Sequence, residues 1–329
     1  MVYNNHMRDI KRVGVLRGGP SHEYEVSLKT GANILNIVRE KDHLYEAYDI
    51  FIDREGNWHI DGAPIVAHDI VHKIDYVLNG LHGNYGEDGK VQKILESIGI
   101  PFSGSDSLSS SIAMNKILAK KVMRDHGIKT PYFKSYEIND SQDIPRIARD
   151  IFHTFPVPGV IKPANAGSSV GISIVHTFSE ILDGLTEALK YDSNILIEEY
   201  IRGSEATCGV IDNFRGQSIY SLPVIEIVPK NHKFFNYSAK YTDGQSDEIV
   251  PARFDHTIKK AIEDISKKVH EVFGLRHYSR SDFIIHPKRG IYCLEVNTLP
   301  GLTNESLFPK AMKAVGSNVG ELVEIIVGE

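Results

Sequence analysis

The sequence predicts a mixed α/β protein, α+β in part, that begins with a doubly wound unit. Near the N-terminus a short apolar strand, residues 12–17, leads through Gly18 and Gly19 into a helix-like segment, residues 24–40. A strand, a glycine turn and a helix are the usual start of a doubly wound fold. Later strands follow one another as hairpins, most clearly in residues 278–301, which is typical of an antiparallel sheet.

Composition and charge exclude several classes of protein. A chain of 329 residues with 41% hydrophobic residues can form two or three domains. Its net charge of −6 argues against a nucleic-acid or membrane surface as the main partner. Residues 1–12 lack the apolar segment of a signal peptide, so we expect a cytoplasmic protein. Cys208 and Cys293 lie in apolar, strand-like runs and should pack as small hydrophobic side chains.

Glu23 stands where the first helix is expected to begin. Ligands of doubly wound units lie outside the carboxyl ends of the strands, and Glu23 follows the first strand at that end. A carboxylate there can bind a ligand, and it can equally complement the helix dipole. The preceding glycines do not form a GxGxxG pattern, so a dinucleotide site is weakly supported.

A glycine-rich loop, residues 81–89, ends the βαβ part of the sequence. Strands expected at residues 46–53 and 74–79 lead to this loop, which carries His82 and Asp88 among its glycines. Such a loop can approach a ligand closely. Asp88 can also serve as the N-cap of the helix expected next, residues 89–99, and both roles can hold at once.

A short strand at residues 100–104 is expected to end the first domain, and a long amphipathic helix should follow it. Its apolar positions include Leu108, Ile112, Ile117, Leu118 and Val122, and its charged positions include Lys116, Lys120 and Lys121. Lysines on a helix are usually solvated. Taken alone, none of the three indicates a site.

A lysine and a loop of small residues form a candidate phosphate site. The strand that ends at Lys162 is followed by a loop, residues 163–171, that contains Ser168 and Ser169. Successive backbone amides and a lysine can hold a polyphosphate. The loop lacks the Gly-Lys-Ser/Thr ending of a P-loop, so we expect a flexible lid between two strands. A plain hairpin turn is the alternative, which the adjacent lysine makes less favoured.

Acidic residues end the next expected strand, residues 194–201. Glu198 and Glu199 close this strand, and Glu205 lies seven residues beyond Glu198. Carboxylates can accept hydrogen bonds from an adenine amino group or from ribose hydroxyls, and a strand-to-linker junction suits a nucleotide base. For Glu199, the residues alone favour a solvated acid at the end of a strand.

A long polar and aromatic segment, residues 229–247, separates the strands expected near residues 217–228 from a periodic helix, residues 255–273. Long loops in compact domains are usually lids or binding elements. The helix has one apolar stripe and is expected only to pack.

The hairpin of residues 278–301 carries the clearest chemical signal. If Pro287 faces Gly290, alternation along the strands defines four pairs on one face. They are Arg280 with Asn297, Asp282 with Glu295, Ile284 with Cys293, and His286 with Ile291.

Two of these pairs predict a metal site. Like charges directly opposite on a sheet destabilise it, so Asp282 and Glu295 need a cation between them. With Asn297 beside them the ligands are hard oxygens, which favour Mg²⁺ or Mn²⁺ over Zn²⁺. A surface hairpin with solvated carboxylates is the alternative. The presence of Asn297 and Arg280 on the same face favours the metal.

Five short motifs occur in order along the chain. They are Gly18-Gly19-Pro20-Ser21-His22-Glu23, His82-Gly83 with Gly86-Glu87-Asp88-Gly89, Lys162-Pro163 with Gly167-Ser168-Ser169-Val170-Gly171, Lys240-Tyr241, and Glu295-Val296-Asn297 with Pro300-Gly301. Together they closely resemble the D-alanine–D-alanine ligases, which are ATP-grasp enzymes, nearly end to end. The resemblance implies an N-terminal, preATP-grasp-like domain (residues 1–104) and a two-lobed ATP-grasp fold with a central lobe (105–200) and a C-terminal lobe (201–329).

The resemblance also implies an activity. Two D-alanines would be joined with ATP through an acyl phosphate, with two Mg²⁺ or Mn²⁺ ions, in a cytoplasmic homodimer that supplies peptidoglycan precursors. Activation by K⁺ is compatible with it. Asp282, Glu295 and Asn297 would bind metal, and Lys116, Lys162, Ser169, Glu198, Glu199, Ile201 and Glu205 would contact ATP. Glu23, Ser168, Tyr241 and His82 would serve the first D-alanine, Arg280 and the Gly301 amide the oxyanion, and Lys240 and Ser306 the second D-alanine.

Four residues depart from the pattern of the family, and other activities stay open. The departures are Tyr24, Asn115, Ala166 and Glu199, none of which is a catalytic group. A D-alanine–D-lactate or D-alanine–D-serine ligase would share the apparatus, although Tyr241 favours the dipeptide. Another ATP-grasp amino-acid ligase should lack the set of Glu23, Ser168 and Tyr241. A non-catalytic nucleotide-binding regulator should lack one of the phosphate, oxyanion or metal groups, and all are present.

Overall fold

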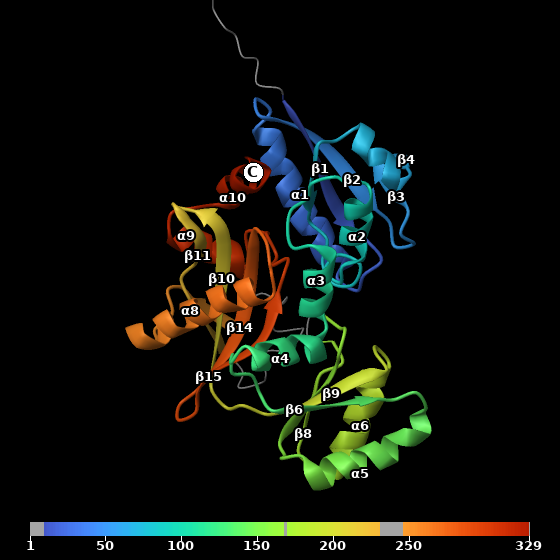
Figure 1. The fold of residues 1–329 in the computed structure, drawn as a ribbon, viewed down its shortest axis with the longest axis vertical. Helices are drawn as coiled ribbons and strands as arrows, with labels where there is room; N and C mark the ends of the chain where they lie inside the picture. Colours follow the sequence, from blue (N-terminus) through green and yellow to red (C-terminus); the bar gives the residue numbers. More distant parts are fainter. Residues whose placement is uncertain (1–9, 168–169, 231–245, 329) are drawn as a thin grey trace, which may run out of the picture.

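The computed structural model describes residues 10–167, 170–230 and 246–328, which build three β-sheets (Figure 1). In the N-terminal sheet, β1 (Lys11–Gly18) lies between two parallel neighbours, β2 (Tyr45–Ile52) and β5 (Tyr76–Asn79). Two short antiparallel strands, β3 (Trp58–Ile60) and β4 (Ala63–Ile65), extend the sheet beyond β2. The predicted parallel start of the fold is therefore confirmed.

The first helix follows the prediction to the residue. α1 spans Tyr24–Glu40 and packs on β1 and β2. Its apolar stripe joins one buried cluster with Val13 and Val15 of β1. By contrast, the strand expected at residues 100–104 is reduced to a single bridge between Val77 and Phe102.

The helix after the glycine-rich loop begins one residue later than expected. α2 spans Lys90–Ser97, and its N-cap is Gly89, not Asp88. Gly89 has φ of +90°, and a Cβ there would lie 2.4 Å from the carbonyl oxygen of Ser107. Only glycine fits this position without strain, so the cap falls on Gly89, while Asp88 accepts a hydrogen bond from the amide of Lys90.

The single long helix expected after residue 104 is two helices, α3 (Ser107–Met114) and α4 (Lys116–Asp125). Asn115 breaks the helix with φ of −78° and ψ of 104°, and its side chain accepts from the amides of Ile117 and Leu118 in α4. This is the ordinary role of an N-cap asparagine. Both helices pack against β15, and apolar residues of both belong to the core of the C-terminal sheet.

The central sheet is antiparallel, with the order β6-β9-β7-β8. Its strands are β6 (Phe133–Glu137), β7 (Gly159–Pro163), β8 (Ser173–Val175) and β9 (Asn194–Glu199). Two helices, α5 (Ile144–Thr154) and α6 (Phe178–Leu189), lie side by side on this sheet (Figure 1). Buried isoleucines and leucines of both layers fill the space between them.

The C-terminal sheet has the order β13-β12-β10-β14-β15, with β11 added to β10. Its strands are β10 (Ser204–Phe214), β11 (Gln217–Ser221), β12 (Ile225–Pro229), β13 (Ser246–Ile249), β14 (Tyr278–His286) and β15 (Gly290–Asn297). The predicted packing helix is α8 (His256–Val272), which lies on β10, β11 and β14. The last helices are α9 (Leu307–Ala314) and α10 (Val319–Gly328).

The two ends of the chain share a core. α10 packs against α1, and its apolar residues join the buried cluster of β1 and α1 (Figure 1). The N-terminal sheet is thus held directly to the C-terminal part. In the described part of the chain, no helix has both the length and the apolar character needed to cross a membrane.

Both cysteines are free and buried, as expected from their apolar surroundings; Cys208 and Cys293 are each 1% exposed. Burial raises the pKa of the Cys208 thiol to about 12, and it also raises the pKa of Cys293. Since the thiolate is the reactive form, both thiols should stay neutral and inert at pH 8. We expect iodoacetamide to label neither cysteine in the native protein and both in urea, as counted by mass. Stoichiometric labelling without denaturant would contradict this packing.

Candidate active site

The hairpin of β14 and β15 brings the predicted polar pairs together. Arg280 pairs with Asn297 and Asp282 with Glu295, as the sequence predicts. The other two predicted pairs are wrong, because the register shifts between Asp282 and Phe283. Beyond the shift, Ile284 pairs with Tyr292 and His286 with Gly290. Leu294 is the extra residue, and such a bulge re-aims side chains by one position.

Arg280 and Asp282 form a fixed pair on this face. The Arg280 guanidinium donates two hydrogen bonds to the Asp282 carboxylate, both 2.9 Å long. The hydroxyl of Thr207 on β10 donates a third, at 2.7 Å. The side chains of Arg280 and Asp282 are only 15% and 17% exposed, and bidentate pairs of this kind are the strong form of such an interaction. Asp282 thereby holds the Arg280 guanidinium at the position where Asp282 and Glu295 pair across the hairpin.

The donor set fits a hard divalent cation. Asp282 and Glu295 face each other in register, and Asn297 follows two residues later on the same strand. Among the described residues, no three His, Cys, Asp or Glu side chains form a metal-binding group. Two carboxylates and an amide oxygen are too few and too hard for a structural Zn²⁺ site. They suit Mg²⁺, which completes its shell with phosphate oxygens and water.

A buried cluster of three charges lies at the junction of α4 and the central sheet. Glu198 of β9 is 3% exposed and pairs with two ammonium groups, that of Lys162 on β7 and that of Lys120 on α4. The Lys120 ammonium lies 2.7 Å from Glu198 Oε2. Burial opposes the charge on Glu198, but the two lysines outweigh it and hold the pKa of its carboxyl below the ordinary value.

Lys120 is the residue that the sequence interpretation missed. We expected a solvated lysine, and the structure buries it to 1% exposure. One signal was available, because Lys120 lies four residues after Lys116 and so shares its helix face. Lys162 and Glu198 were expected near different parts of a nucleotide, and the structure brings them into direct contact.

The N-terminus of α4 is attached to the loop after β7. The Lys116 ammonium donates to the carbonyl oxygen of Ala166, and its amide donates to Ala164 at 2.9 Å. The Asn115 side chain donates to that of Asn165, also at 2.9 Å. Of the two departures from the family pattern here, Asn115 caps α4, and Ala166 offers its backbone carbonyl to Lys116. Ser168 and Ser169 lie outside the described residues.

Glu23 faces the same loop across a surface hollow. The hollow is lined by Ser21, His22, Glu23, Gly83, Asn84, Asn165, Ala166, Gly167, Val170, Lys190 and Tyr191. Glu23 is 8% exposed, and a Cβ at Gly167 would lie 2.5 Å from its Oε1. The first and third motifs are thus in contact. Tyr24, the neighbouring departure, stacks under Arg54, whose guanidinium carbon is 3.9 Å from the ring centre.

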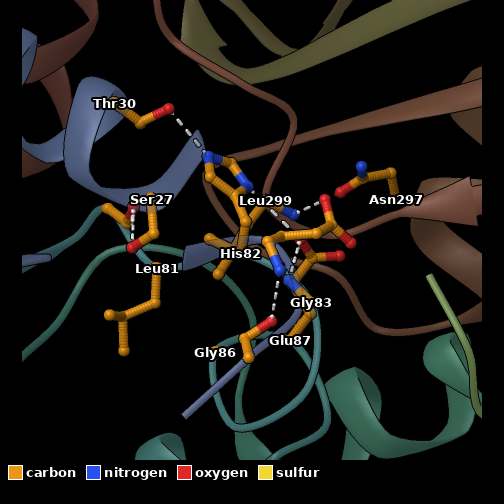
Figure 2. Close-up of polar contacts among 12 residues, drawn as sticks. Ser27, Thr30, Leu81, His82, Gly83, Gly86, Glu87, Asn297 and Leu299 are labelled. Carbon is orange, nitrogen blue, oxygen red and sulfur yellow. Dashed lines mark hydrogen bonds and ion pairs between the residues drawn. The ribbon is translucent and has the colours of Figure 1, made fainter. Parts of the chain in front are cut away.

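His82 is held in a buried cluster with Thr30 and Glu87 (Figure 2). Its Nε2 is hydrogen bonded to the Thr30 hydroxyl at 2.8 Å, and its Nδ1 lies 3.3 Å from Glu87 Oε1. The same Glu87 oxygen accepts from the amide of Gly83 at 3.0 Å. Burial raises the pKa of the Glu87 carboxyl, and the charge of Glu23 adds to this, although His82 acts against it. The imidazole is therefore fixed in orientation.

Gly301 and Ser306 meet at the start of α9. A Cβ at Gly301 would lie 2.8 Å from the Ser306 hydroxyl, so a larger residue at position 301 would displace that hydroxyl. The hydroxyls of Thr303 and Ser306 are 2.8 Å apart. Lys240, which was expected beside Ser306, and Tyr241, which was expected beside Glu23, both lie outside the described part of the chain.

The remaining residues that are predicted to contact the nucleotide lie around the end of β9. Glu199 is not simply solvated, because its Oε2 pairs with the Arg289 guanidinium at 2.8 Å and its Oε1 accepts from the Tyr132 amide. Ile201 is buried to 4% exposure. Glu205 lies on β10 in register with residues of both neighbouring strands, β12 and β14.

Comparisons with known proteins point to one family. Residues 122–328 match the family model described as D-ala D-ala ligase C-terminus, and residues 63–105 match the one described as D-ala D-ala ligase N-terminus. The D-alanine–D-alanine ligase of Syntrophotalea carbinolica is 41% identical over 318 residues, covering 96% of this chain and 95% of that protein. The ligase of Carboxydothermus hydrogenoformans is 37% identical over 318 residues, covering 96% and 97%.

Solved structures agree in fold over nearly the whole chain. The VanG D-Ala:D-Ser ligase from Enterococcus faecalis superposes with a TM-score of 0.84 at 30% identity, covering 97% of this chain and 99% of that one. The D-alanine–D-alanine ligase from Bacillus anthracis complexed with ATP gives a TM-score of 0.78 at 32% identity, covering 97% and 96%.

Proposed function

Because this chain belongs to the D-alanine–D-alanine ligase family, we propose that it uses ATP to join two D-alanines into D-alanyl-D-alanine. Its fold is the ATP-grasp fold of these enzymes. We further propose that the protein works as a cytoplasmic homodimer that supplies peptidoglycan precursors, and that the domains divide near residues 104 and 200. The contact between Glu23 and the loop after Lys162 carries the proposal, because it brings the residue that we assign to the amino acid against the loop that we assign to phosphate.

ATP is proposed to lie between the central sheet and the C-terminal sheet. Lys116 and Lys162 neutralise its phosphates, with Ser169 of the loop beside them. The carboxylates of Glu198 and Glu205 accept hydrogen bonds from the adenine amino group and the ribose, with Glu199 and Ile201 at the rim of the base. Asp282, Glu295 and Asn297 would hold Mg²⁺ or Mn²⁺, which would supply charge neutralisation at the phosphates.

The first D-alanine is proposed to bind beside Glu23. The carboxylate of Glu23 receives its ammonium group, supported by Ser168 and Tyr241, and His82 lies toward its carboxylate. That carboxylate attacks the γ-phosphorus of ATP, so a C–O–P bond forms as the bond to ADP breaks. The products of this step are D-alanyl phosphate and ADP.

The second D-alanine is proposed to be held through its carboxylate by Ser306 and Lys240. Its neutral amine attacks the acyl carbon, and phosphate leaves as the amide forms. Charge develops on the acyl oxygen in this step, and we assign its stabilisation to the Arg280 guanidinium and the Gly301 amide. Exclusion of water by the surrounding loops protects the acyl phosphate from hydrolysis.

Glu23→Gln is expected to raise KM for the first D-alanine about tenfold with a smaller change in kcat, because a charged acceptor for ammonium becomes a neutral one. Steady-state ADP release at varied D-alanine measures this. Glu25→Gln is the matched control, since Glu25 is on the same helix with its side chain 73% exposed. Equal KM values for both variants would remove Glu23 from the substrate site.

The substrate assignment is tested by identifying products by mass. The purified protein is incubated with Mg²⁺ and ATP, with and without K⁺, and with D-alanine, L-alanine, or D-alanine plus D-serine or D-lactate. We expect D-alanyl-D-alanine as the main product. A mixed product, D-alanyl-D-serine or D-alanyl-D-lactate, in excess over the dipeptide would assign the second site to another substrate.

A further inference from the structure

Lys120 occupies a position that lysine ordinarily avoids. The side chain is 1% exposed, and its ammonium group is 2.7 Å from Glu198 Oε2 and 2.9 Å from the Thr130 hydroxyl. A buried ammonium group destabilises a protein unless it is paired and hydrogen bonded. Here both conditions are met, and the partner is the carboxylate that we place at the adenine.

One carboxylate in this cluster contacts two lysines. Glu198 pairs through one oxygen with Lys162 and through the other with Lys120. The two lysines hold the pKa of the Glu198 carboxyl below its ordinary value, and burial lowers the pKa of the Lys120 ammonium group. A single carboxylate is thus shared by two buried lysines. One lysine is enough to balance Glu198, so the other can serve a second anion.

The two lysines differ in how firmly they are held. Lys120 is fixed by the Thr130 hydroxyl as well as by Glu198. Lys162 lies near the end of β7, next to the loop that follows, and its side chain is 8% exposed against 1% for Lys120. Lys162 is therefore the lysine that can turn toward phosphate, and Lys120 is the one that stays paired with Glu198.

We propose that Lys120 is a positioning residue for the nucleotide, which keeps its pair with Glu198 when ATP binds and so frees Lys162 for the phosphates. Glu198 then remains charged and oriented toward the adenine amino group. This inference rests on the proposed function, which places the phosphates at Lys162 and the base at Glu198. Without Lys120, Glu198 would retain Lys162, and phosphate and carboxylate would compete for one cation.

The test is ATP binding with Mg²⁺ by calorimetry, without D-alanine so that no turnover occurs. Lys120→Met removes the charge and keeps the apolar stem, and we expect Kd for ATP to rise about tenfold. Lys121→Met, at the exposed neighbouring position, is the matched control and should bind like the wild type. Equal Kd values for the two variants would overturn the inference.

Repeating the Lys120→Met substitution in a Glu198→Gln variant separates a positioning role of Lys120 from a merely structural one. In Glu198→Gln the carboxylate no longer retains Lys162, so adding Lys120→Met should raise Kd by less than about threefold. The same tenfold rise in both backgrounds would mean that Lys120 acts without Glu198 and would overturn the proposal. If Lys162→Met and Glu198→Gln both bind ATP normally, the nucleotide placement itself fails.

Thr130→Val provides an independent variant should Lys120→Met fail to fold. It removes only the hydroxyl that fixes Lys120 and leaves every charge in place. We expect a rise in Kd for ATP of about twofold to threefold, since one neutral hydrogen bond is lost. An unchanged Kd in a folded Thr130→Val protein would count against the positioning role.

Discussion

Arg280→Ala is expected to lower kcat about 10²–10³-fold, the usual loss for one oxyanion donor. Its guanidinium is held by two hydrogen bonds to Asp282, opposite Asn297 in the hairpin. The residue is proposed to meet charge that develops only in the transition state, so kcat should fall more than substrate affinity. Steady-state ADP release at saturating substrates measures the effect.

Arg12→Ala is the matched control for this prediction. Arg12 also forms a two-bond pair with an aspartate, Asp75, but it lies on β1 of the N-terminal sheet with its side chain 37% exposed. Its loss should leave kcat close to that of the wild type. Thermal unfolding of both variants checks that they fold. Near-normal turnover by Arg280→Ala would remove the residue from the mechanism.

Glu295→Gln is expected to lower turnover about 100-fold at millimolar Mg²⁺ and to raise the Mg²⁺ concentration needed for half-maximal rate. The change keeps the shape of the side chain and removes one of two facing carboxylate charges. Titration of the rate with MgCl₂ measures both effects.

Glu46→Gln serves as its control, because Glu46 is an exposed strand residue of β2 in the N-terminal sheet. Its Mg²⁺ dependence should match the wild type. If Glu295→Gln has the same half-maximal Mg²⁺ concentration as this control, the paired carboxylates of the hairpin do not hold the metal.

Local patterns predicted those parts of the molecule in which neighbouring residues decide the structure. The helix predicted for residues 24–40 has the same bounds in the structure. The hairpin residues Asp282 and Glu295 pair as the alternation of side chains along the strands predicts. The bulge at Leu294 was not predicted, because one extra residue depends on how the whole sheet twists. The break at Asn115 was missed because asparagine also occurs within helices.

Contacts between distant segments could not be read from the sequence. Lys120 resembles any helical lysine until the fold places Glu198 beside it, although 78 residues separate them in the numbering. Glu199 likewise finds Arg289 only in the folded chain. The pairing of charges is decided by tertiary packing, and sequence alone supplies only the charged groups.

The most direct test of the mechanism uses D-alanine labelled with ¹⁸O in its carboxylate. If the first carboxylate attacks ATP, one labelled oxygen must pass to inorganic phosphate when the acyl phosphate is cleaved by the second amine. We predict inorganic phosphate with one ¹⁸O atom for each peptide bond formed, as seen by mass spectrometry. Phosphate without ¹⁸O, released together with dipeptide, would contradict the acyl-phosphate route.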